Sequence, residues 1–226
     1  YRSTLSRIIL AMTFGLVMWR CLPSAKKRLV VVPSRNRTLV ASLIIVPILI
    51  QIYSRNPLSV LPIYAFLNLV FVTLFIGIAE EFLSRGIVFT LFEKSGVWRA
   101  VAISSISFGV MHYMALNRSS NFERVTWHVI SATSIGFLFA GLMLFTKSIW
   151  VPISFHTLYN LPILQSGVGS QNIKQSVSSH YMFQVLITSF LQIATAFILI
   201  QYSLNGSRSF EKLFLKFKLI EKPMER

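Results

Sequence analysis

Long apolar stretches with few or no charged residues, separated by short polar segments, run along most of the chain. A helix needs about 20 apolar residues to cross the hydrocarbon core of a bilayer, and four of the stretches have that length. Three others are shorter, and two of these contain internal prolines. The pattern therefore predicts an all-α bundle of transmembrane helices, over residues 5–19, 38–53, 57–79, 97–116, 125–146, 149–164 and 181–204.

No long polar segment separates these stretches, so we expect one integral-membrane domain over residues 1–226. The chain starts at Tyr1 and not at a methionine, so a preceding segment could supply an eighth span. A re-entrant turn around residues 80–92 is the other source of an additional span. The sequence therefore predicts seven to eight spans.

Composition agrees with a polytopic membrane protein, since 54% of the residues are hydrophobic, 13% are charged and the mean hydropathy is +0.65. The net charge of +15 could indicate nucleic-acid binding, but the basic residues are divided unevenly between the two sides of the predicted bundle. This asymmetry is the positive-inside pattern. We therefore expect no nucleic-acid partner and contact with the lipid bilayer. We also expect a bacterial cell membrane location, with the basic loops and C-terminal tail in the cytoplasm. The sequence does not indicate an oligomeric state.

Two adjacent glutamates, Glu80 and Glu81, follow the uncharged stretch 57–79, and Arg85 follows Glu81 by one helical turn. A charged side chain at the centre of a bilayer costs roughly 2.5–3.5 kcal/mol on insertion scales, so such groups indicate function. The four-residue spacing predicts an ion pair between Glu81 and Arg85. Glu80 lies about 100° around the helix from Glu81, so it is expected to face elsewhere and to act as a general base.

Two further polar pairs occur inside predicted spans, each with the four-residue spacing that places both members on one helix face. Phe108 and His112 lie in the span 97–116, and His156 and Asn160 lie in the span 149–164. A base, a histidine that orients water and two donors for an oxyanion would be sufficient to add water to an amide carbonyl.

Structural alternatives remain open for each of these groups. The two glutamates and Arg85 could form a buried ionic staple or a proton relay. His112, His156 and Asn160 could form helix-to-helix hydrogen bonds, and Phe108 alone indicates only packing. His128 and His180 lie near predicted span ends without a partner at helical spacing, which favours positions at the membrane interface.

Several catalytic classes are excluded by absent motifs. The chain has no aspartate, no HExxH motif, no GxSG turn and no phosphate-binding glycine loop. These absences remove the aspartyl, zincin-type and serine-type intramembrane proteases, and they disfavour nucleotide-driven transport. The single cysteine, Cys21, excludes a disulfide framework.

The three pairs occur in the order of three family motifs. Glu80, Glu81 and Arg85 resemble the EExxxR motif of the CAAX protease and bacteriocin-processing (CPBP, or Abi) family, Phe108 and His112 resemble its FxxxH motif, and His156 and Asn160 resemble its HxxxN motif. The resemblance covers roughly residues 74–164, the expected catalytic core. It implies an all-helical membrane protein with a cavity open to the cytosol.

Carried over from that family, Glu80 would activate water with the help of His112, and His156 and Asn160 would stabilise the oxyanion. Glu81, Arg85 and Phe108 would support the site. Whether these proteases use a metal is disputed, and Zn²⁺ held by Glu80, His112 and His156 is one option.

The resemblance implies an intramembrane endopeptidase that cleaves a membrane-associated peptide or protein, either prenylated or of the bacteriocin or pheromone type. The alternative is a non-catalytic bacteriocin self-immunity or membrane scaffold protein of the same fold. A proton-coupled carrier is disfavoured, because the sequence shows no inverted repeat.

Overall fold

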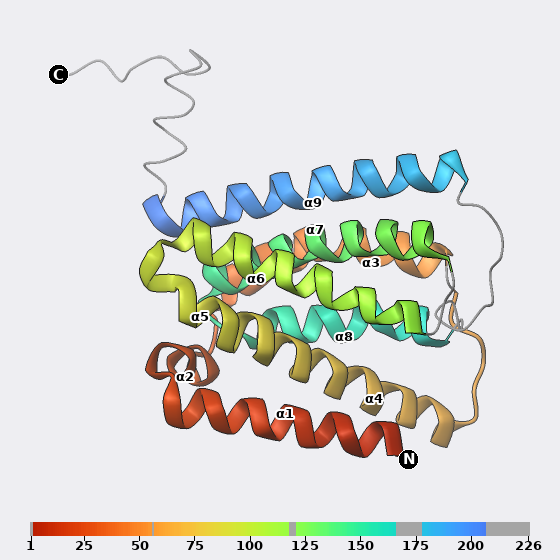
Figure 1. Cartoon of the computed structure of the whole chain (residues 1–226), viewed down its shortest axis with the longest axis horizontal. Helices are drawn as coiled ribbons and strands as arrows, with labels where there is room; N and C mark the ends of the chain where they lie inside the picture. Colours follow the sequence, from red (N-terminus) through yellow and green to blue (C-terminus); the bar gives the residue numbers. More distant parts are fainter. Residues whose placement is uncertain (1, 56, 118–120, 166–177, 207–226) are drawn as a thin grey trace, which may run out of the picture.

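The computed structural model of the chain describes residues 2–55, 57–117, 121–165 and 178–206, and these residues form helices and connecting segments without a strand (Figure 1). The all-α class predicted from the sequence is confirmed. The α-helices are α1 (Arg2–Cys21), α2 (Pro23–Val30), α3 (Arg35–Arg55), α4 (Ile63–Glu81), α5 (Phe89–Phe92), α6 (Val97–Met111), α7 (Phe122–Thr146), α8 (Trp150–Gln165) and α9 (Ser179–Asn205). A π-helix η1 (Phe82–Val88) and two 3₁₀ segments, η2 (Glu93–Ser95) and η3 (His112–Asn117), complete the described elements.

Each of the seven predicted apolar stretches corresponds to a helix, namely α1, α3, α4, α6, α7, α8 and α9. Four described helical stretches are long and apolar enough to cross a membrane: Arg35–Ser54, Ile63–Ser95, Phe122–Thr146 and Ser179–Asn205. The bent pair of α1 and α2 would make a fifth. Helices α6 and α8 have 15 and 16 residues, fewer than the about 20 that a full crossing needs. The predicted count of seven to eight spans is therefore not confirmed.

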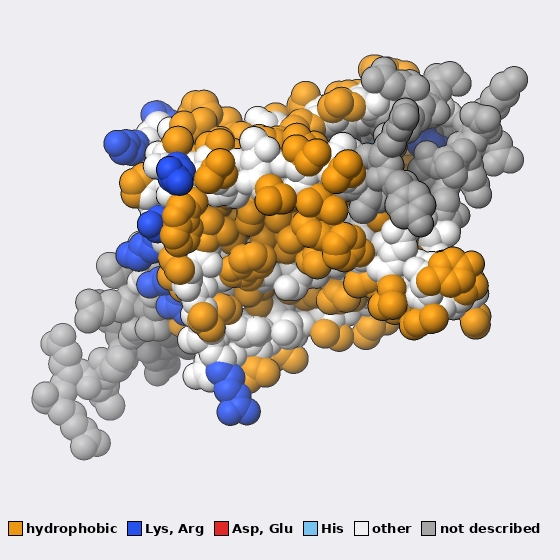
Figure 2. Space-filling model, turned by 90° about the horizontal axis from the view of Figure 1, so that it is seen from below, with side chains coloured by type: hydrophobic (Ala, Val, Ile, Leu, Met, Phe, Trp, Pro, Cys, Tyr) orange, Lys and Arg blue, Asp and Glu red, His pale blue; other side chains and the backbone are white. Residues whose placement is uncertain are grey.

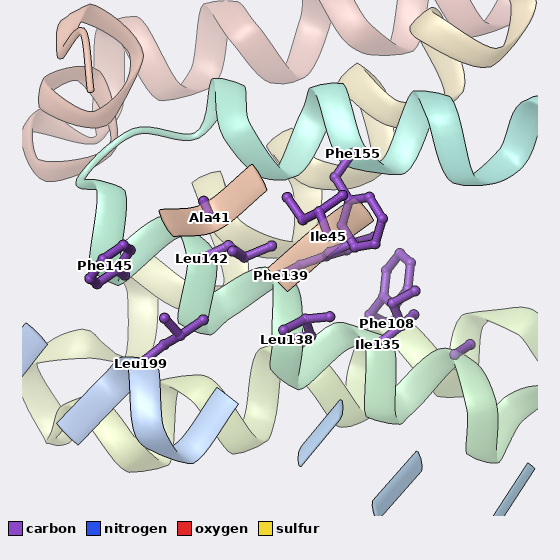
Figure 3. Packing of buried hydrophobic residues seen from close by; sticks show 11 residues of the cluster. Ala41, Ile45, Phe108, Ile135, Leu138, Phe139, Leu142, Phe145, Phe155 and Leu199 are labelled. Atoms are coloured by element: carbon purple, nitrogen blue, oxygen red, sulfur yellow. The ribbon is translucent and has the colours of Figure 1, made fainter. Parts of the chain in front are cut away.

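Helix α7 is the centre of the bundle. In its most apolar 18-residue stretch 72% of the residues are buried, against 33% or less for the other three candidate spans. It packs against α9, α6, α8 and α3. Figure 3 shows the core at this helix, where Phe139 of α7 lies between Phe108 of α6 and Phe155 of α8, with ring centroids 6.3 and 5.5 Å apart.

Small residues on α7 allow its neighbours to approach closely. A Cβ atom added to Gly141 would lie 3.1 Å from the Cα atom of Ala196 on α9, and one added to Gly136 would lie 3.2 Å from the Cα atom of Ser105 on α6. Helices in membranes associate through such small-residue contacts, because burial from lipid supplies no hydrophobic driving force.

The outer surface of the bundle is largely apolar, and cationic side chains gather at one end of it (Figure 2). That end holds α2, η2 and the connection from α7 to α8. Hydrogen bonds from Ile149 N to Arg28 O and from Trp150 Nε1 to Leu29 O join α2 to this connection and to the start of α8. Its described basic residues are Arg20, Lys26, Lys27, Arg28, Arg35, Arg37, Lys94, Arg99 and Lys147. The charge asymmetry expected from the sequence is thus a property of the folded bundle.

Candidate active site

The glutamate–arginine motif spans the end of α4 and the π-helical segment that follows it. Helix α4 does not turn back after Glu81 but continues as the π-helix Phe82–Val88, in which the amide of Phe89 donates to the carbonyl of Ser84 five residues earlier. The helical stretch then runs on through α5 to Ser95. The sequence allowed a re-entrant turn here, and the structure has a continuous helix instead. Short π-helical insertions occur frequently at functional sites.

Glu81 and Arg85 form the ion pair that their spacing predicts. Arg85 Nη1 lies 3.1 Å from Glu81 Oε1, and both side chains are completely buried. Arg85 Nη2 donates to the carbonyl oxygen of Gly136 on α7 at 2.8 Å. The guanidinium also lies over the ring of Phe108, 4.6 Å from its centroid. These contacts fix the arginine in the core, and its role in supporting the site stays a prediction.

His156 of α8 contacts both glutamates. Its Nδ1 atom lies 3.0 Å from Glu81 Oε1, and its Nε2 atom lies 3.7 Å from Glu80 Oε2. Because Glu81 is ion-paired with Arg85 and therefore ionised, its oxygen accepts, and Nδ1 carries the proton of the hydrogen bond. In the neutral imidazole Nε2 is then an acceptor, and it faces Glu80.

The two adjacent glutamates differ in environment as the sequence predicted. Glu81 is fully buried, whereas the side chain of Glu80 is 34% exposed. Glu80 therefore has side-chain surface outside the protein core, and Glu81 has none.

His112 contacts Phe108 and His128, and not the two glutamates, in the described part of the chain. Its Nδ1–H donates to the carbonyl oxygen of Phe108 at 2.8 Å, and its ring centroid is 5.0 Å from those of Phe108 and His128. Phe108 also contacts the ring of His156, with centroids 5.8 Å apart. The FxxxH motif thus places Phe108 between the two histidines, and among the described residues no contact joins His112 to Glu80.

Sequence reasoning missed two features of this region. His128 was expected to lie at the membrane interface without a partner at helical spacing, yet its ring packs against that of His112. The contact between His156 and the glutamates was also not foreseen, because it joins residues 75 positions apart. Asn160 is half-buried on α8 one turn after His156, and its side chain makes no hydrogen bond within the described part of the chain.

The residues suggested for zinc do not form a metal site in this arrangement. Within residues 2–55, 57–117, 121–165 and 178–206, no three His, Cys or Glu side chains are grouped so that they could hold a metal ion. Glu80 and His156 are close, but the nearest aromatic neighbours of His112 are Phe108 and His128. We therefore derive no catalytic step through a metal, and Zn²⁺ binding stays a prediction.

Comparison with known proteins shows that this segment is similar to membrane peptidases. Residues 62–162 match the family described as Type II CAAX prenyl endopeptidase Rce1-like. Over 84 residues the chain is 38% identical to a protein of Bacillus subtilis (strain 168) named "Putative membrane peptidase YdiL". That alignment covers 37% of this chain and 30% of the length of the relative. No solved structure matches the chain significantly. The family match contains all three motifs.

Proposed function

Since residues 62–162 match the Rce1-like CAAX endopeptidase family and carry all three motifs, we propose that this chain is an intramembrane endopeptidase of the CPBP type in which Glu80 activates water. The substrate would be a membrane-associated peptide or protein. Prenylated proteins and peptides of the bacteriocin or pheromone type are the two classes that the resemblance implies.

The observation that carries the proposal is the position of His156 between the two glutamates. The 3.7 Å from its Nε2 atom to Glu80 Oε2 is too long for a direct hydrogen bond. A water molecule that donates one hydrogen to each atom would connect them and keep an oxygen lone pair free for a carbonyl carbon. Glu81 holds His156 in the tautomer that this requires.

The charge of the cluster leaves Glu80 free to take a proton from that water. Arg85 compensates Glu81, so with neutral His156 the charge of Glu80 is uncompensated. When Glu80 takes a proton, the four residues become neutral and the negative charge passes to the hydroxide, then to the carbonyl oxygen that it attacks, where hydrogen-bond donors can stabilise it. The same proton can then pass to the leaving amine, as general acid–base catalysis requires.

His112 and Asn160 keep the roles that the family resemblance gives them in this proposal. His112 donates its Nδ1–H to a carbonyl, so its Nε2 atom is an acceptor, and it would act on a second water because both hydrogens of the bridging water are used. Asn160 would donate its amide to the oxyanion. His156 would become a second donor after its Nε2 atom takes the other hydrogen of the attacking water.

The test is cleavage by the purified protein in nanodiscs, with prenylated and unmodified membrane-tethered peptides as substrates and mass spectrometry as the readout. Glu80→Gln should lower the rate by about 10²–10⁴-fold, the range typical of general acid–base catalysis. Glu123→Gln is the matched control, because Glu123 is exposed in the first turn of α7. Equal cleavage by the parent and Glu80→Gln would show that Glu80 is not the base.

A further inference from the structure

Helix α2 turns away from the bundle axis. It forms an angle of 115° with α1, so it lies across the end of the bundle while α1 runs along it (Figure 1). One face of α2 is buried, since Ala25 is inaccessible and Leu29 packs on the cluster that contains Met18, Phe82 and Ile149. An eight-residue helix lying across a bundle end, with one face buried, has the position of a membrane-surface helix.

The carbonyl groups at the end of α2 are held by α8 and the residue before it. Ile149 N donates to Arg28 O at 3.3 Å, and Trp150 Nε1 donates to Leu29 O at 2.8 Å. Arg28 itself points inward, where it pairs with Glu93 and donates to Thr90 Oγ1. The orientation of α2 is therefore fixed, and its outward face is defined.

That outward face is cationic and has no anionic partner in the described part of the chain. Lys26 and Lys27 are exposed on α2, and Arg20 is exposed at the end of α1. Lys26 Nζ lies 4.1 Å from the ring centroid of Trp19, the residue that precedes Arg20 in α1. At this end of the described structure the one carboxylate is Glu93, and Arg28 already neutralises it.

Tryptophans at the same end indicate the level of the membrane surface. Trp19, Trp98 and Trp150 begin or end helices there, and all three are exposed. Tryptophan is enriched at the boundary between hydrocarbon and headgroups, where phosphate groups lie. The three cations are thus at the depth of lipid phosphates, and a cation near an anionic membrane surface contributes about 1 kcal/mol to the attraction.

We propose that α2 is a membrane-surface helix that binds the headgroups of anionic phospholipids through Arg20, Lys26 and Lys27. This proposal does not depend on the peptidase reaction, because none of the three residues contacts the Glu80–His156 site.

The test compares lipid binding by the parent and by the double variant Lys26→Gln/Lys27→Gln, in detergent micelles to which phosphatidylglycerol or phosphatidylcholine is added. Retained lipid is measured by native mass spectrometry and stabilisation by thermal unfolding. The parent should prefer phosphatidylglycerol, and its half-saturation should move to about thirty-fold higher lipid in the double variant, as expected for the loss of two surface charges. Lys26→Arg/Lys27→Arg keeps both charges and should behave as the parent does.

Three results would overturn the proposal. The first is a double variant that still prefers phosphatidylglycerol at the parent's half-saturation. The second is complete competition by soluble glycerol 3-phosphate at the same concentration, which would indicate a phosphate site independent of lipid. The third is binding that does not weaken in high salt. If the double variant folds poorly, the single variant Arg20→Gln takes its place. A weaker preference of this variant for phosphatidylglycerol supports the proposal, and an unchanged preference contradicts it.

Discussion

Glu81 and His156 are 75 positions apart in the chain, and a 3.0 Å hydrogen bond between Glu81 Oε1 and His156 Nδ1 joins the end of α4 to the middle of α8. The same carboxylate oxygen accepts from Arg85. One buried oxygen thus fixes both a structural cation and the histidine that faces Glu80. The stability of the core and the geometry of the candidate site depend on a shared atom.

Arg85→Ala should be strongly destabilising. Arginine keeps its charge in proteins, so in the parent it compensates Glu81, and its removal leaves a buried carboxylate without a cation. Loss of one partner of a buried pair costs about 3–5 kcal/mol. Thermal unfolding in detergent should show a large drop in Tm. The double variant Arg85→Met/Glu81→Gln should recover part of it, and a stable, active Arg85→Ala protein would contradict the importance of the pair.

Substitutions of the two adjacent glutamates should differ in their effects on thermal stability and on cleavage activity. Glu81→Gln removes a buried charge that Arg85 and His156 both need, so it should lower Tm and activity together. Glu80→Gln changes a partly exposed side chain and should leave Tm near that of the parent while activity is lost. Parallel unfolding and cleavage assays check this, and an unfolded Glu80→Gln protein would assign the structural role to Glu80.

Substitutions of His156 should distinguish its two nitrogen atoms. The amide nitrogen of Asn can take the place of Nδ1 and that of Gln the place of Nε2. His156→Asn should therefore keep the donor to Glu81 and most of the stability, whereas His156→Gln should lose more of it. Neither variant can accept and return a proton, so both should be inactive. Substantial cleavage by His156→Asn would show that Nε2 takes no part in the reaction.

Gly136→Ala should disturb the site through Arg85. The added Cβ atom would lie 3.2 Å from Arg85 Nη2 and equally close to the backbone of Ser105, so the guanidinium or α6 must shift. Overpacking of this kind costs about 1–3 kcal/mol. Both Tm and the cleavage rate should fall. Gly141→Ala meets α9 at 3.1 Å, away from the ion pair, and provides the control that should lower Tm without a specific loss of kcat.

Features that depend on local spacing were predictable from the sequence. The four-residue separation of Glu81 and Arg85 was sufficient to predict their ion pair, and the lengths of the apolar stretches were sufficient to locate α1, α3, α4, α6, α7, α8 and α9. Both signals are contained within a single helix, where the geometry is regular.

Features that depend on contacts between helices were not predictable in the same way. The position of His156 between the glutamates and the packing of His128 on His112 are set by how α4, α6, α7 and α8 assemble. The π-helix after Glu81 has no periodic signature, and α2 was hidden in a basic segment that the sequence indicated only as a loop. The predicted number of membrane spans depended on the lengths of the apolar stretches, and the helices α6 and α8 are shorter than a helix that crosses the whole membrane.

The length of the stretch Ile63–Ser95 has a consequence for membranes of different thickness. Its 33 residues would extend about 50 Å at 1.5 Å per residue, well beyond a hydrocarbon core of about 30 Å. A stretch with this hydrophobic mismatch adapts by tilting, and a tilting rod displaces its ends far more than its centre. Glu80 lies near the middle of the stretch, close to the pivot. A thinner or thicker bilayer would therefore move Glu93 and the start of α4, while Glu80 stays at nearly constant depth.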